Sequence, residues 1–324
     1  MVSRFRENSS GVIFWLLLLS IGLHVSFFQH PPEIIAAQGT GALGGMFYLL
    51  PPLPPIILVL VYHALIVFQA LRLNHIASEL RLYPKVAYVV GMTYILLTAL
   101  FEQWAHITPA LICNSLLIWL FGKMVRLQEV SLTRPVIYNI GMIAGLSVVL
   151  YHPAVTLVLL CLLALAILRP FHLNEWFIML LGVVTPFYFL ISVLFLSNSL
   201  EDIWLYIPEW SWHLPLPAHG LKTLLATAIL WGVLLLVGIY LWRSHAKRTL
   251  IQVRKAWAVL LFMLLVLLPV MVICKDAGFE SGIMAMVPAA AFIAGIFLFP
   301  RRTWLPALLF WLLTLLSLYN TWQH

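Results

Sequence analysis

The sequence predicts an all-α, polytopic transmembrane bundle of about eleven spans, with the N-terminus in the cytoplasm and the C-terminus outside. Two observations predict this fold class: the amino-acid composition and the placement of the basic residues. Of the 324 residues, 63% are hydrophobic and only 9% are charged, whereas a soluble domain is about a quarter charged. A soluble core of this size cannot hide so much apolar surface, so lipid must be the solvent for most of it.

The basic residues fall almost entirely in alternate gaps between the hydrophobic stretches. Sixteen of the eighteen Lys and Arg residues lie in every second gap, counted from Arg4 and Arg6, and the other gaps hold only Lys222 and Lys275. Basic residues near membrane spans stay on the cytoplasmic side, so this sorting predicts the orientation. It also explains the net charge of +7 through contacts with anionic lipid headgroups, and no nucleic-acid partner is expected.

Eleven stretches are predicted to cross the bilayer as helices. A helix needs about 20 apolar residues for a hydrocarbon core of about 30 Å, and fewer where flanking side chains snorkel. The first stretch lacks a small-x-small cleavage site, so we interpret it as a retained span and not a signal peptide. The predicted spans are Val12–Phe28, Ile56–Leu73, Val86–Leu100, Ile107–Leu120, Val136–Tyr151, Ala154–Leu168, Trp176–Leu196, Leu221–Trp242, Trp257–Cys274, Gly282–Phe299 and Trp304–Leu318.

Residues 136–168 allow two interpretations. In the first interpretation they form two full spans joined by the tight turn Tyr151-His152-Pro153. In the second they form a re-entrant hairpin. Because Arg134 and Arg169 flank the pair, we favour two full spans.

The whole chain, residues 1–324, is predicted to form a single transmembrane domain. Its two longest gaps are predicted to lie outside. In the first, Ile34–Leu50 is expected to be a short helix or a re-entrant segment that ends at a proline cluster. The second, Ser197–Gly220, contains Trp204, Tyr206, Trp210 and Trp212. Aromatic rings favour the headgroup boundary, so this loop is expected to lie along the membrane.

Three side chains in the outer gaps are the candidate catalytic residues: Glu102, His106 and Glu33. If the third span continues helically, Glu102 and His106 share a face at spacing i, i+4. A carboxylate beside an imidazole can act as a general base or help to bind a metal. Two solvated polar groups in a turn are the alternative, and because metal sites usually have three protein ligands, no metal site is predicted. No cofactor can be named.

Glu33 closely follows the first span. Multi-span glycosyltransferases that use polyprenyl-phosphate sugars place a catalytic acid in this first outer loop, and the resemblance is one of position. Glu102 and His106 are expected to lie in an outward-facing cavity together with Glu33 or His152, and a structure that shows whether these side chains and His213 converge would test this.

One histidine, His63, is predicted to lie well within a span. Ionisable groups at that depth face the interior of the bundle, and a neutral ring hydrogen-bonded to a backbone carbonyl is the expected state. A proton relay would need partners at similar depth. Pro186, Pro269 and Pro288 are candidates for breaks in their helices.

The segment from Leu71 to Leu190 carries a family resemblance. It contains Ala70-Leu71-Arg72-Leu73-Asn74, the turn around Glu102, Thr108-Pro109-Ala110-Leu111-Ile112 with Asn114, and Gly145-Leu146 before Tyr151-His152-Pro153. Arg169-Pro170-Phe171 with Glu175-Trp176, and Leu181-Gly182 with Thr185-Pro186-Phe187-Tyr188, complete the pattern. This resembles a family of uncharacterised multi-pass inner-membrane proteins of Bacteroidetes-type bacteria. The resemblance implies a location in the bacterial inner membrane and lends no catalytic residue.

Arg169 and Glu175 in this pattern flank a predicted cytoplasmic turn. Pro170 ends one helix, and Glu175 at the start of the next favours the helix dipole. We expect the pair to act as a structural staple across the turn, with binding of a partner as the alternative.

Three functions remain open at this point. The first is an accessory or scaffold subunit of a membrane complex in cell-envelope assembly, whose partners are other envelope membrane proteins. The second is an enzyme or carrier that acts on a polyprenyl-linked or other lipid at the outer face, in the manner of a glycosyltransferase. The third is a small-molecule transporter. Whether the chain is an enzyme is left open.

Overall fold

The computed structural model describes most of the chain. The described residues are 2–7, 9, 11–35, 41–46, 53–128, 133–201, 203, 210–212, 221–246, 249–274, 277–300, 302 and 304–322. Their regular secondary structure is helical, and the extended pairing among them is limited to two isolated β-bridges, Ile34 with Ile107 and Trp210 with Cys274. The predicted all-α class is confirmed for this part of the chain.

Each of the eleven predicted spans contains an α-helix. The α-helices are α1 Val2–Phe5, α2 Gly11–Leu23, α3 Ala42–Met46, α4 Pro55–Glu79, α5 Val89–Thr98, α6 Pro109–Val125, α7 Thr133–Leu150, α8 Thr156–Leu168, α9 Leu173–Leu196, α10 Leu221–Ala246, α11 Ile251–Leu267, α12 Val270–Ile273, α13 Met286–Leu298 and α14 Trp304–Trp322. The short 3₁₀ helices are η1 Val25–Phe28, η3 Glu102–Trp104, η4 Arg126–Gln128, η5 His152–Val155 and η8 Phe279–Ala285.

Seven of the described helices are long and apolar enough to cross a membrane. They are Pro55–Glu79, Pro109–Gln128, Leu173–Leu196, Leu221–His245, Ile251–Ile273, Phe279–Leu298 and Trp304–Trp322. Four further apolar helices have 10 to 17 residues: Gly11–Leu23, Val89–Thr98, Arg134–Leu150 and His152–Leu168. Seven such helices in one chain make this a membrane protein.

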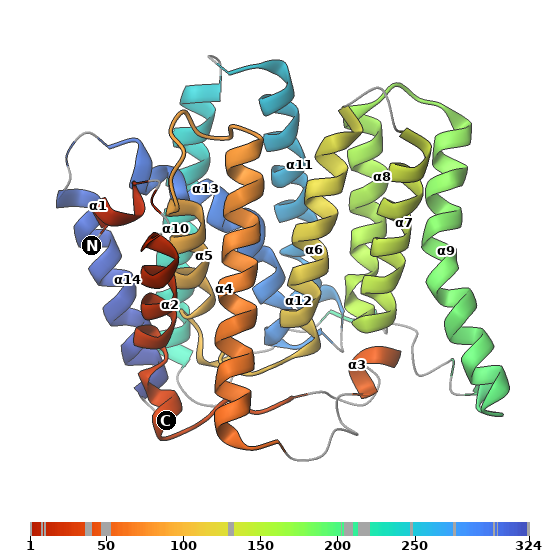
Figure 1. Cartoon of the computed structure of the whole chain (residues 1–324), viewed down its shortest axis with the longest axis horizontal. Helices are drawn as coiled ribbons and strands as arrows, with labels where there is room; N and C mark the ends of the chain where they lie inside the picture. The colour runs from red at the N-terminus through yellow and green to blue at the C-terminus, as the bar shows by residue number, and fades with distance from the viewer. Residues whose placement is uncertain are drawn as a thin grey trace.

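Successive long helices run in opposite directions through the bundle (Figure 1). We call the end at which α4, α6, α8 and α10 finish, at the top of Figure 1, the basic end. Among the described residues, the Lys and Arg side chains belong to helix ends and turns at this basic end, except for Arg72, which lies two turns before the end of α4, and Lys222 at the start of α10. The alternation that the sequence predicts therefore reappears in the structure as a separation of charge between two ends.

Two short helices, α5 and α13, form the centre of the bundle. Every residue of α5 is buried, and so is every residue of α13 from Met286 to Phe297. The outer helices α9, α10 and α14 instead expose rows of large apolar side chains. This arrangement is typical of a bundle whose outer surface is solvated by lipid.

Helices α7 and α9 pack at very close range through three glycines. A Cβ added at Gly141 would collide with the Met179 carbonyl, and one added at Gly145 with the Val183 carbonyl. From the other side, a Cβ at Gly182 would collide with the Tyr138 carbonyl. Gly141 and Gly145 have the four-residue spacing of small residues that lets membrane helices approach.

The outer gaps differ in part from the prediction. The first predicted span is α-helical only to Leu23 and continues as η1. In the predicted segment Ile34–Leu50, the residues described after Ile35 form the short helix α3. Of the four aromatic residues expected on the membrane surface, Trp210 and Trp212 are exposed, whereas 204 and 206 lie outside the described residues.

The three prolines behave differently from one another. Pro269 separates α11 from α12, as expected of a helix break. Pro186 lies inside the continuous helix α9, and Pro288 lies in the first turn of α13. The first helical turn tolerates proline because its backbone N–H has no intrahelical acceptor.

Candidate functional site

The structure brings together two of the predicted catalytic residues, Glu33 and His106. Their segments form a parallel β-bridge, in which Ile107 N–H donates to the Glu33 carbonyl (2.9 Å) and Ile35 N–H donates to the Ile107 carbonyl (3.1 Å). The backbone N–H of Glu33 also donates to Nδ1 of His106 (3.4 Å). Two loops that are far apart in sequence are thus joined at the end opposite the basic end.

Glu102 also lies near His106, but the sequence did not predict the local structure that places it there. Helix α5 ends at Thr98, and Glu102 begins the separate 3₁₀ helix η3. The expected shared α-helical face of Glu102 and His106 is therefore wrong, because the chain must turn before Pro109 opens α6. Burial lowers the pKa of His106 below 6.5, and the charges of Glu33 and Glu102 oppose that shift. A neutral ring suits an Nδ1 that accepts a hydrogen bond.

Of the two further histidines, the structure describes His152. His152 is buried in η5, at the connection between α7 and α8. His213 lies outside the described residues. Within the described part of the chain, no group of three or more His, Cys, Asp or Glu side chains could hold a metal ion. Glu33, Glu102 and His106 form an acid–imidazole cluster, with Glu33 exposed and the other two half-buried.

His63 is not the only buried histidine between spans, which corrects the sequence interpretation. Its Nδ1 lies 2.9 Å from Oγ of Ser20, so its partner is a hydroxyl and not a backbone carbonyl. His24 is buried beside it, with Nδ1 2.9 Å from the Ser20 carbonyl and Nε2 3.2 Å from Oη of Tyr62. Tyr62 donates in turn to the Trp104 carbonyl (3.1 Å), and this network ties α2 and α4 to η3.

Arg169 and Glu175 form the predicted ion pair across the turn before α9. Arg169 Nε and its terminal nitrogen donate to the two carboxylate oxygens of Glu175 at 3.0 Å and 2.9 Å. Both side chains are largely buried. Such a two-pronged pair fixes the geometry of the turn, as a structural staple requires.

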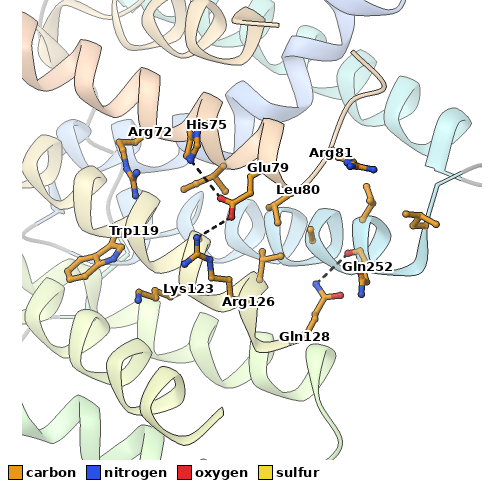
Figure 2. Close-up of a pocket in the computed structure, with 16 residues that line it drawn as sticks. Arg72, His75, Glu79, Leu80, Arg81, Trp119, Lys123, Arg126, Gln128 and Gln252 are labelled. Atoms are coloured by element: carbon orange, nitrogen blue, oxygen red, sulfur yellow. Dashed lines mark hydrogen bonds and ion pairs between the residues drawn. The ribbon is translucent and has the colours of Figure 1, made fainter. Parts of the chain in front are cut away.

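A charged cavity of about 410 Å³ opens at the basic end of the bundle (Figure 2). Its walls come from α4, the turn after α4, α6, η4 and the first part of α11. We call it the basic pocket. Its described ionisable side chains are Arg72, His75, Glu79, Arg81, Lys123 and Arg126.

Helix spacing places these side chains in the pocket. Arg72, His75 and Glu79 follow one another at intervals of three and four residues on α4, so they lie on one face of the helix. Glu79 accepts a hydrogen bond from Arg126 (3.1 Å) and lies 3.9 Å from Nε2 of His75. Figure 2 shows this carboxylate at the centre of the group.

Arg81 has an unusual backbone conformation. It follows the end of α4 with a φ of 51°, in the left-handed region that glycine normally occupies. Leu82 N–H reaches back to the Ala77 carbonyl (3.0 Å) and closes the helix end. An arginine in this conformation costs roughly 1 kcal/mol relative to glycine. Strained residues of this kind often mark a binding site.

Sequence reasoning missed the basic pocket. From the sequence, its arginines and lysine are interpreted as signals of topology and as general contacts with anionic lipid headgroups, and not as one pocket. The available clue was the helical spacing of Arg72, His75 and Glu79, which puts an acid among bases on one face. The second wall, from Lys123 and Arg126, could not be paired with the first without the packing of α6 on α4.

Comparisons with known proteins do not assign a function to this site. No family model matches the chain, and no curated protein and no solved structure shows detectable similarity to it. The functional argument therefore depends on the site itself.

Proposed function

We propose that this protein binds an anionic lipid, holding its headgroup in the basic pocket. The observation that carries the proposal is the charge of the pocket. Its described lining has four cationic side chains, Arg72, Arg81, Lys123 and Arg126, and a single carboxylate, Glu79. Basic pockets between membrane helices on the cytoplasmic side are suited to phosphate headgroups.

The position of the pocket favours a lipid over a soluble anion. Trp119 at its edge is 44% exposed and Leu250 is 67% exposed. Tryptophan prefers the boundary between headgroups and hydrocarbon. Arg72 lies seven residues before the last residue of α4, so it is set about 10 Å below the helix end. A cation at that depth is costly unless an anion reaches it.

The proposal includes a topology. We infer eleven spans in the bacterial inner membrane, with the basic end in the cytoplasm. The alternating helices and the gathering of basic side chains at one end support this orientation. The turn before α8 supports two full crossings by α7 and α8, because the Leu150 carbonyl contacts Gly44 of α3, in the outer gap.

Cysteine labelling tests the topology. Cysteines introduced at Ser199, after α9, and at Ser244, near the end of α10, are expected to react from opposite sides of the membrane, outside and inside respectively. The three native cysteines are buried and give little background. Labelling of both positions from one side would contradict the topology.

Native mass spectrometry of the purified protein tests lipid binding. Wild-type protein is expected to retain phosphatidylglycerol in preference to phosphatidylcholine. The double variant Arg72→Gln/Lys123→Gln is expected to lose roughly tenfold or more of this retention, because two charge-assisted contacts disappear while the side chains stay polar.

Two matched variants serve as controls for general electrostatics. Arg302→Gln removes a charge at the basic end away from the pocket, and Lys222→Gln removes one at the opposite end. Both should bind phosphatidylglycerol as the wild type does. Equal losses in the control variants and in the pocket variant would mean that net charge, and not the pocket, attracts the lipid.

A second candidate is an enzyme acting on a polyprenyl-linked lipid at the outer face. The approach of Glu33, Glu102 and His106 favours it, since an acid and an imidazole can share a proton transfer. An accessory role in cell-envelope assembly, and membership of the Bacteroidetes-type family, stay predictions. Lipid binding at the basic end is compatible with each of them.

A further inference from the structure

We propose that the basic pocket selects lipids whose headgroup ends in a phosphomonoester or a diphosphate over lipids with a phosphodiester headgroup. This inference rests on the proposed lipid binding and narrows its ligand class. The candidate ligands share a terminal phosphate on a long apolar chain.

Charge balance is the first argument. Four cationic side chains and one carboxylate give the described lining a formal charge of +3, with His75 counted as neutral. A phosphomonoester carries about −1.5 to −2 charges at pH 7, and a diphosphate carries more. A phosphodiester headgroup carries one negative charge on its phosphate, so it leaves more of the pocket charge uncompensated.

Hydrogen-bonding capacity is the second argument. Within the described part of the chain, the side chains of Arg72, Arg81 and Lys123 have no hydrogen bond or ion pair with protein groups. Figure 2 shows them at different sides of the pocket. A terminal phosphate offers three acceptor oxygens, whereas a phosphodiester has two that are not esterified. Hydrogen-bond donors on several sides of the pocket therefore suit a terminal phosphate better than a phosphodiester.

Glu79 moderates the positive charge of the pocket. It orients Arg126 through their 3.1 Å contact, and its negative charge also repels any bound anion. Removal of this charge in Glu79→Gln is expected to tighten binding of a terminal phosphate roughly fivefold, because the ligand then faces cations alone.

Arg81 allows binding to be separated from folding. Glycine at this position relieves the left-handed strain, so Arg81→Gly is expected to keep or raise thermal stability. If the guanidinium contributes to the site, the same variant binds the terminal phosphate several-fold more weakly. If the role of Arg81 were purely structural, the variant would not raise thermal stability while it weakens phosphate binding.

The test compares lipids that share the same acyl chains. Full-length protein in mild detergent is titrated with phosphatidic acid, a phosphomonoester, and with phosphatidylglycerol, a phosphodiester, and adducts are counted by native mass spectrometry. Phosphatidic acid is expected to bind about tenfold more tightly. Inorganic pyrophosphate is then added to compete with the bound lipid. Displacement of the lipid identifies a site that recognises a free anion.

The outcomes separate the two proposals. A preference for phosphatidic acid that falls in Lys123→Gln and Arg81→Gly, but not in Arg302→Gln, supports the inference. Equal binding of both lipids overturns it and leaves lipid binding intact. Binding of neither lipid overturns both proposals. Full displacement by pyrophosphate at equal concentration overturns the lipid source and assigns the pocket to a soluble phosphate.

Discussion

The variant Gly182→Val is expected to lower the free energy of unfolding by roughly 3 kcal/mol, the upper range for an overpacked core. The added side chain would collide with the Tyr138 carbonyl of α7. Backbone atoms cannot move aside as a flexible side chain can, so α7 and α9 must separate. The effect can be measured as a lower thermal midpoint for the purified protein in detergent.

Gly232→Val is the matched control for this prediction. Gly232 lies in α10, and a Cβ there meets no atom within 4 Å. The control variant makes the same chemical change at a helix position that has no close neighbour. If both variants unfold at the same temperature, close packing of α7 on α9 is not what the glycine at 182 provides.

The second large effect is expected at the ion pair of Arg169 and Glu175. Their side chains are only 17% and 11% exposed, so each variant, Arg169→Met or Glu175→Met, leaves a charge largely buried without its partner. We expect each single change to cost roughly 2 to 3 kcal/mol, somewhat below the range for a fully buried pair. Unfolding in mixed detergent and SDS micelles measures this loss.

The double variant Arg169→Met/Glu175→Met decides what the pair does. Because it removes both charges, it should cost less than the sum of the single changes. Additive losses would show that the two side chains act independently of each other, through contacts such as that of Arg169 with the Leu127 carbonyl.

The sequence predicted the positions of the helices well because their signals are local. Apolar length and alternating basic residues are properties of neighbouring residues, and each predicted stretch contains an α-helix. The end of the third span was less predictable. Nothing in the local sequence around Glu102 shows that η3 must turn to pack on η8, where Trp104 donates to the Phe279 carbonyl (3.1 Å).

Sites that combine distant segments were harder to predict. The approach of Glu33 to His106 was expected only because both were assigned to one side of the membrane, and the β-bridge that joins them depends on how the two loops meet. For a similar reason, the sequence did not predict that His24 lies beside His63. His24 follows the last residue of α2, and only packing against α4 takes it out of contact with water.

The central place of α13 has a consequence for the order in which the protein is made. This helix leaves the ribosome after every helix from α2 to α12, yet it occupies the middle of the bundle. Helices α5 and α10, which pack closely on α13 in the finished bundle, are synthesised before it and must wait without it. Biogenesis therefore requires a partly assembled bundle to stay open until α13 emerges and fills its centre.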